Sequence, residues 1–286
     1  MNSRTTVTNS ARLAAVVMLL ALSVTTVDLQ AQGPRGGPPP VPKARAPFDM
    51  TGYWTAVITE DWHQRMLTAV KNDMGSGTFA TGFGGRGVGG GNIPYNGAAR
   101  QLIEAWDPAK DEREGNPCKA YGAAGIMRQP TRLRVSWLDD FTLKIETDYG
   151  TQTRLFNFQR PQAQATTAAT RPAGEPPAAP SLQGNSVAEW IIIGGTRPGW
   201  LVGGNLKVIT TNVTPGYYWK NGMPYSGRAV ITEHFRVHKL LDNTEWIVFS
   251  QRVEDPAYLN QPFIVTYHYK KLPNGNDWSP TPCTAR

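Results

Sequence analysis

The sequence predicts an all-β fold, either an antiparallel β-barrel or a closely related β-sandwich, with one short helix. Three observations lead to this prediction. Apolar and polar residues alternate through most segments from residue 131 onward, which is the period of half-buried strands. Turn sequences separate these segments, and only one segment has the spacing of an amphipathic helix. Many even strands joined by short turns are typical of barrels and two-sheet sandwiches.

The first predicted strand is TGYWTAVIT, residues 51–59, in which Gly52 and Trp54 open the apolar alternation. The alternation stops in EDWHQRM, residues 60–66, where Asp61 and His63 lie close together. This end of the strand is either a solvent-exposed strand end or part of a catalytic acid–base site. The second alternative arises because His titrates near neutral pH and a carboxylate can orient it.

The helix is expected at residues 96–108. Asn96 can cap its start, Leu102 and Trp106 contribute to one apolar face, and Pro108 ends it.

Three segments between residues 131 and 158 predict an antiparallel meander. The segments 131–137, 141–148 and 151–158 each place apolar residues at every second position, and Asp-Asp and Tyr-Gly turns join them. Five further strands are rich in β-branched and aromatic residues: 186–193, 205–213, 228–240, 245–253 and 263–271.

The chain is expected to consist of a leader, a tether and one β domain. Residues 1–31 read as a signal peptide, with Arg4 and Arg12 before an apolar run. That run is about a dozen residues, short of the ~20 that a membrane-spanning helix needs, although an uncleaved anchor remains the alternative. A Pro/Gly-rich tether at 32–47 precedes a single domain at 48–286. We therefore expect a periplasmic or secreted protein that does not span the membrane.

Two insertions in the domain, at about 75–91 and 160–180, are expected to be flexible because their low-complexity composition cannot bury a core. The first contains a formal GxGxxG at Gly85, Gly87 and Gly90. It does not follow a convincing parallel strand and lacks a suitably placed acidic residue, so no nucleotide cofactor is expected.

The formal net charge is +7, but its distribution does not indicate a nucleic-acid partner. Lys and Arg are scattered, with no run of five or six like charges. The charge is interpreted as favouring solubility, or attraction to acidic envelope surfaces or anionic ligands.

The two cysteines, Cys118 and Cys283, predict one disulfide in an oxidising compartment, with two free thiols as the alternative. No CxxC is present, and the four histidines lack spacings such as HxH or HExxH. Sheet-edge histidines are therefore favoured over a metal site, and no metal or other cofactor is expected.

Two charged residues fall on the same face of their predicted strands as nearby apolar residues. Glu233 alternates in phase with Ile231 and Phe235, and Arg252 in phase with Trp246, so both are expected to face inward. Charges on an inward face are costly unless they are paired with each other or with a ligand. A buried structural ion pair and a ligand-anchoring pair both fit this pattern. The carboxylates of Glu254-Asp255 are interpreted as the start of a turn, with acid–base work as the alternative.

The runs GNSVAEW, NLKVITTN, RAVITEHFRV and RVEDPAYLNQPF resemble the C-terminal half of a group of exported bacterial all-β proteins of uncertain activity. This resemblance covers about residues 184–265 and implies an envelope β protein. TGYW separately resembles the Gly-x-Trp opener of lipocalins, in which the Trp closes the base of the barrel and packs on an Arg from a late strand. It implies a lipocalin-like barrel.

We therefore expect the barrel to bind a small hydrophobic or aromatic molecule in an internal cavity. Trp54 would form its floor, and Tyr121, Tyr217 and Tyr225 would line or gate its mouth, unless these aromatic residues simply pack the loops. The residues expected to orient a polar group of the ligand are Arg128, Arg154, Glu233 and Arg252.

One alternative is a cofactor-independent isomerase, lyase or hydratase, with Asp61, His63 and Tyr121 as its first catalytic candidates. A structural envelope protein is a third possibility. The sequence does not indicate the oligomeric state.

Overall fold

A computed structural model describes residues 41–59, 93–160, 179–194 and 203–286. The chain divides into two compact units, Met1–Pro39 and Pro40–Arg286, and all described residues belong to the second. The predicted signal peptide, the first predicted insertion, and both Asp61 and His63 lie outside the described residues. The same is true of most of the tether and of the second insertion.

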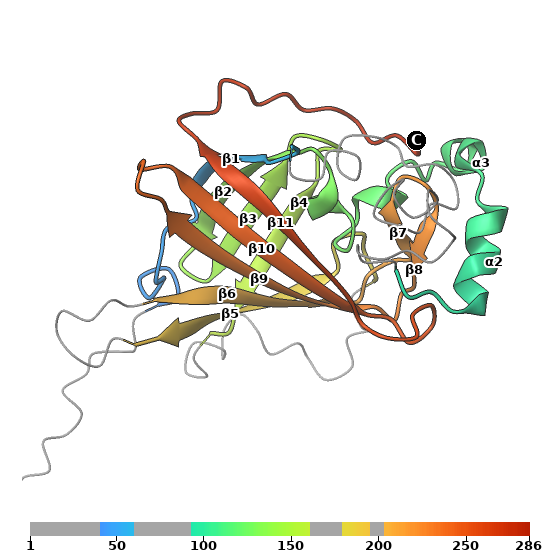
Figure 1. The fold of residues 1–286 in the computed structure, drawn as a ribbon, viewed down its shortest axis with the longest axis horizontal. Coiled ribbons are helices and arrows are strands. Elements are labelled where there is room, and N and C mark those ends of the chain that lie inside the picture. The colour runs from blue at the N-terminus through green and yellow to red at the C-terminus, as the bar shows by residue number, and fades with distance from the viewer. Residues whose placement is uncertain (1–40, 60–92, 161–178, 195–202) are drawn as a thin grey trace, which may run out of the picture. The chain divides into compact units, whose positions relative to one another are not determined.

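Nine strands close into a barrel in the order β1-β11-β10-β9-β6-β5-β4-β3-β2 (Figure 1). The strands are β1 Gly52–Ala56, β2 Arg132–Asp139, β3 Thr142–Thr147, β4 Thr153–Phe158, β5 Asn185–Ile193, β6 Gly203–Thr211, β9 Val230–Lys239, β10 Glu245–Glu254 and β11 Phe263–Leu272. The predicted all-β fold is confirmed, and the barrel is the observed form of it. Each barrel strand overlaps a segment that the sequence predicts to be a strand.

One strand pair departs from the expected antiparallel arrangement. β4 and β5 run parallel, with Phe156 opposite Ser186 and Phe158 opposite Ala188. A parallel pair needs a crossover connection of a dozen or more residues. The chain between Phe158 and Asn185 is long enough to supply it.

Strand β1 completes the barrel because it pairs with β11 on one side and β2 on the other. Trp54 on this strand is fully buried, and its indole N–H donates to the Met50 carbonyl at 2.9 Å. The Lys271 ammonium, on the last strand, lies 5.3 Å from the centre of the Trp54 ring. Trp54 thus lies at the seam where the first and last strands meet, which is an architectural position.

Apolar side chains from all nine strands fill the barrel interior as one contiguous core. Its fully buried aromatic residues include Phe156, Phe235 and Phe249, whose neighbouring ring centres lie 5.5 and 4.9 Å apart. Since these rings pack against one another, this part of the interior is a close-packed core.

A second core cluster lies beside the barrel, where two helices face a small hairpin (Figure 1). The elements are helices α2 Gly97–Ala105 and α3 Pro108–Arg113, and strands β7 Gly216–Trp219 and β8 Met223–Tyr225. The chain enters the helices between β1 and β2 and the hairpin between β6 and β9. These two insertions into the barrel sequence build the subregion that holds the candidate site.

The helical prediction is right about the first helix and wrong about its end. The Asn96 side chain caps α2 by accepting from the Ala99 N–H at 3.1 Å, as expected. Pro108, however, occupies the first turn of a second helix, α3, where Asp107 accepts from the Ala109 N–H at 2.9 Å. Pro is favoured at this position because its missing N–H has no partner in the first turn anyway.

The predicted disulfide is confirmed: Cys118 and Cys283 are bonded, with their Cα atoms 5.0 Å apart. The bond fixes the C-terminal tail beside α3. There the Ala285 N–H donates to the Glu112 carboxylate at 2.6 Å.

None of the helices in the described part of the chain has both the length and the apolar character needed to cross a membrane.

Candidate functional site

A pocket of about 330 Å³ lies between α2, α3 and the β7–β8 hairpin. We call it the side pocket. Its aromatic and apolar wall consists of Leu102, Ala105, Trp106, Pro215, Gly216, Tyr217, Pro224, Tyr225 and Tyr258, and its charged residues are Asp107, Lys110, Asp111, Glu114 and Lys119. The volume falls in the range of small-molecule sites, roughly 300–1,000 Å³, and an apolar lining with a few polar groups is their usual composition.

Trp106 forms one wall of the side pocket, and a glycine behind it sets its position. Trp106 follows the last residue of α2 in extended backbone, and its N–H bonds to the Ile103 carbonyl. Its ring lies against Gly222 in the hairpin turn, where a Cβ atom would sit 2.3 Å from the indole Cγ and where φ is +82°. Only glycine fits both the backbone conformation and the close contact.

The second aromatic wall is Tyr217 on β7. Its ring centre lies 6.3 Å from that of Trp106, and the two planes meet at 76°. The pocket therefore presents two aromatic surfaces that are nearly perpendicular to each other.

Two buried polar groups of the wall are unsatisfied. The Trp106 indole N–H and the Tyr225 hydroxyl have no hydrogen-bond partner among the residues that the structure describes. Tyr225 packs tightly against Gly122, where a Cβ atom would lie 2.0 Å from the hydroxyl oxygen. An unsatisfied buried polar group costs about 1–3 kcal/mol of stability.

Asp111 is the buried carboxylate of the side pocket. It accepts from the Lys119 ammonium at 2.5 Å and from the Tyr217 hydroxyl at 2.9 Å. Burial, and then the hydrogen bond to Asp111, raise the pKa of the Tyr217 phenol well above its usual value. Tyr217 is therefore a neutral donor at physiological pH and does not act as a general base.

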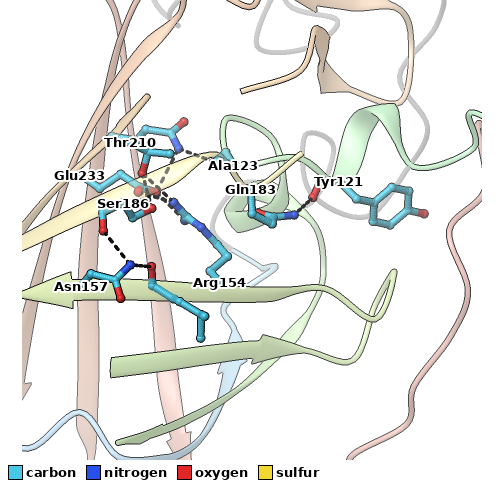
Figure 2. Close-up of polar contacts among 10 residues, drawn as sticks. Tyr121, Ala123, Arg154, Asn157, Gln183, Ser186, Thr210 and Glu233 are labelled. Carbon is cyan, nitrogen blue, oxygen red and sulfur yellow. Dashed lines mark hydrogen bonds and ion pairs between the residues drawn. The ribbon is translucent and has the colours of Figure 1, made fainter. Parts of the chain in front are cut away.

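A buried ion pair joins two strands inside the barrel (Figure 2). The guanidinium of Arg154 on β4 donates to both carboxylate oxygens of Glu233 on β9, at 2.8 and 2.6 Å, and both side chains have zero exposure. Gln251 donates to the same carboxylate at 3.3 Å and to the Ala123 carbonyl at 3.2 Å. Thr210 accepts from Arg154 at 3.4 Å. Within the chain, Glu233 is thus matched in charge and hydrogen bonding.

Arg252 corrects one of our predictions. It was expected to face inward on β10, but its side chain is 44% exposed and pairs with the neighbouring Glu254 at 2.5 Å. The inward face of β10 carries Ile247, Phe249 and Gln251 instead. Because apolar residues occupy both faces of this strand, their alternation does not reveal which face is inside.

The remaining site candidates in the described part of the chain lie outside the side pocket. Trp54 is part of the barrel core. The Tyr121 ring is fully buried, and its hydroxyl accepts from the Thr284 N–H at 3.3 Å. The Arg128 guanidinium lies 4.1 Å above the Trp219 ring. Of the predicted mouth residues, the structure brings only Tyr217 and Tyr225 together in one pocket wall.

The sequence prediction missed Trp106, Asp111 and Lys119 as pocket residues. A signal for Asp111 is present in the dipeptide Asp107-Pro108, which is typical of an N-cap and first helical position. It places Asp111 one helical turn after the cap. The position of Lys119 depends on the disulfide-linked loop and carries no such signal.

The predicted turn after β10 is confirmed. The Asp255 carboxylate accepts from the N–H and the hydroxyl of Ser226, both at 2.6 Å, and from the Ala257 N–H at 3.0 Å. His234 lies 2.9 Å from the Asn205 side-chain oxygen. Within the described ranges, no three His, Cys, Asp or Glu side chains are grouped so that they could hold a metal ion.

No protein-family model, no curated protein and no solved structure matches this chain. Function is therefore inferred from the site alone.

Proposed function

We propose that this β-barrel protein binds a small molecule with an apolar or aromatic body in the side pocket. The observation that carries the proposal is a pocket of about 330 Å³ whose wall is mainly aromatic and apolar and whose lining includes a few charged groups. The proposal keeps the ligand class that the sequence favours but places it beside the barrel, because packed side chains occupy the barrel core.

The barrel serves as a rigid support for this site. Both halves of the side pocket are insertions between barrel strands, and the Cys118–Cys283 disulfide anchors the loop that carries Lys119. Sites of this kind are disproportionately found on loops that a rigid scaffold positions. We further infer that the protein acts in the periplasm or outside the cell, since a disulfide persists in an oxidising compartment.

Of the described acid–base groups, neither Tyr121 nor Tyr217 favours catalysis over binding. Tyr121 is buried and bonded to the tail, and the raised pKa of Tyr217 keeps its proton in place at neutral pH. The two catalytic candidates that accompany Tyr121, Asp61 and His63, lie outside the described residues.

The proposal is tested by filling the side pocket. Ala105 is an exposed pocket residue at the end of α2, so Ala105→Trp adds bulk to the pocket without removing a contact. We expect mass spectrometry of denatured wild-type protein to detect a copurified small molecule that Ala105→Trp lacks. Adding the extracted molecule back should raise the melting temperature of the wild type only.

The matched control is Ala109→Trp, an exposed position on α3 that does not line the pocket. This variant should retain the ligand. Equal retention by both variants would contradict binding in the side pocket.

A further inference from the structure

Among the residues that line the side pocket, carboxylates outnumber ammonium groups. Three carboxylates line it, from Asp107, Asp111 and Glu114, against the two ammonium groups of Lys110 and Lys119. Lys119 is held by Asp111 at 2.5 Å, and Lys110 lies 3.8 Å from Glu114. Asp107 lies 3.6 Å from Arg113, and Arg113 does not line the pocket.

The aromatic walls attract positive charge as well. The face of an aromatic ring is the negative part of its quadrupole, and perpendicular rings form the walls of cages that bind ammonium groups. In this protein both walls already have a cation of the chain beside them. The Lys119 ammonium lies 5.7 Å from the Tyr217 ring centre, and the Arg286 guanidinium lies 6.0 Å from that of Trp106.

The carboxylates also act on the Tyr217 phenol. After burial, the charges of Asp111 and Glu114 contribute to the raised pKa of the Tyr217 phenol. A field that opposes the loss of a proton from Tyr217 also favours a positive group beside it.

We infer that the ligand of the side pocket is an organic cation, with an ammonium group on an apolar or aromatic body. This inference rests on the proposed function and specifies its ligand class. The ammonium would lie between the Trp106 and Tyr217 rings, on the side of Asp111 and Glu114, where it would compete with the ammonium of Lys119.

The net charge of the whole chain would not by itself favour binding of a cation. The formal charge is +7, so the molecule as a whole attracts anions. A preference for a cation must therefore come from local groups.

The test uses three probes that share a phenylethyl body: 2-phenylethylammonium, 2-phenylethanol and 3-phenylpropionate. We expect isothermal titration calorimetry of the wild type to show the ammonium binding roughly tenfold more tightly than the alcohol, and the carboxylate most weakly. Glu114→Gln, at a half-exposed side chain, should weaken only the ammonium, by roughly threefold. Glu104→Gln, on the exposed face of α2 and outside the pocket, is the matched control and should change nothing.

A second variant tests the competition with the chain's own cation. Lys119→Met removes the ammonium beside Asp111 and Tyr217, so the affinity for 2-phenylethylammonium should rise by roughly tenfold, with no comparable gain for the alcohol. An unchanged or lower affinity for the ammonium would contradict the assigned position.

The two proposals fail in different ways. If the alcohol or the carboxylate binds as tightly as the ammonium, or if the ammonium does not bind, the cation inference is overturned. If Ala105→Trp binds the probes as well as the wild type does, the side pocket is not the site and the proposed function falls with the inference.

Discussion

Arg154 and Glu233 illustrate how a charged pair is accommodated in an apolar barrel. Two hydrogen bonds join them, Gln251 also donates to the Glu233 carboxylate, and Thr210 accepts from the Arg154 guanidinium. The Arg154 Nε–H has no partner among the described residues. Moving two charges out of water is costly, so such a pair contributes little net stability. Removing one partner is different, because the other charge is then left buried alone.

Replacing Glu233 with Gln should therefore lower the free energy of unfolding by about 3–5 kcal/mol, because Arg154 loses its counter-charge. Urea denaturation followed by tryptophan fluorescence measures this change. The control is Glu189→Gln on β5, whose side chain is 56% exposed beside Lys207. It should cost no more than about 1 kcal/mol. Comparable losses in the two variants would contradict the buried role of Glu233.

For single residues, the sequence predicts that the Glu233 side chain faces the barrel interior, but it does not predict the ion-pair partner of Glu233. Ile231 and Phe235 lie in phase with Glu233 on a strand with one apolar face, so alternation identifies the inward side. Arg154 belongs to β4, which is not paired with β9 in the barrel order. Contact between them across the interior depends on barrel closure, which no local pattern encodes.

Among the elements, the β7–β8 hairpin depends most strongly on one glycine. Gly222→Ala would force a side chain into the left-handed region and against the Trp106 ring. We expect it to cost about 1–3 kcal/mol in backbone strain, and more from the displaced ring. The ligand-induced rise in melting temperature should fall as well.

Gly97→Ala is the comparison for that variant, since a Cβ atom at Gly97 meets nothing within 4 Å. Gly97 lies at the start of α2, so the change should be neutral or stabilising by up to about 1 kcal/mol. If Gly222→Ala melts like Gly97→Ala, the role given to the hairpin turn is wrong.

Elements that depend on local chemistry are predictable, whereas those that depend on packing are less so. Asn96 caps α2 as the sequence predicts, because an N-cap bond joins residues three apart. β8 is buried at all three positions and has no alternation to identify it as a strand. The side pocket forms where this hairpin meets α2 and α3, which are distant in sequence, so its shape is not predictable from either segment.

For the molecule as a whole, the disulfide links the C-terminal tail to the loop before β2. Its cysteines are 165 residues apart, so the bond restricts a large part of the unfolded chain. Chain entropy assigns such a loop about 5 kcal/mol as an upper estimate.

The all-β class and most barrel strands follow from the sequence, but the parallel β4–β5 pair does not, because strand order is a long-range property.

The double variant Cys118→Ser/Cys283→Ser should lower the free energy of unfolding by about 2–5 kcal/mol, because its unfolded state is less restricted. Thermal melts with and without reductant measure this effect. A reductant should lower the melting temperature of the wild type and leave that of the double variant unchanged. A wild type that melts identically under both conditions would contradict a stabilising disulfide.

The most direct test of the central claim is an NMR measurement of two tryptophan indole N–H groups while the copurified ligand is added. Trp106 lines the side pocket, whereas Trp54 lies in the barrel core with its N–H bonded to Met50. Each signal is assigned by a Trp→Phe variant. Binding in the side pocket predicts that the Trp106 signal shifts and the Trp54 signal stays. A shift of Trp54 with Trp106 unchanged would place the ligand inside the barrel and contradict the account.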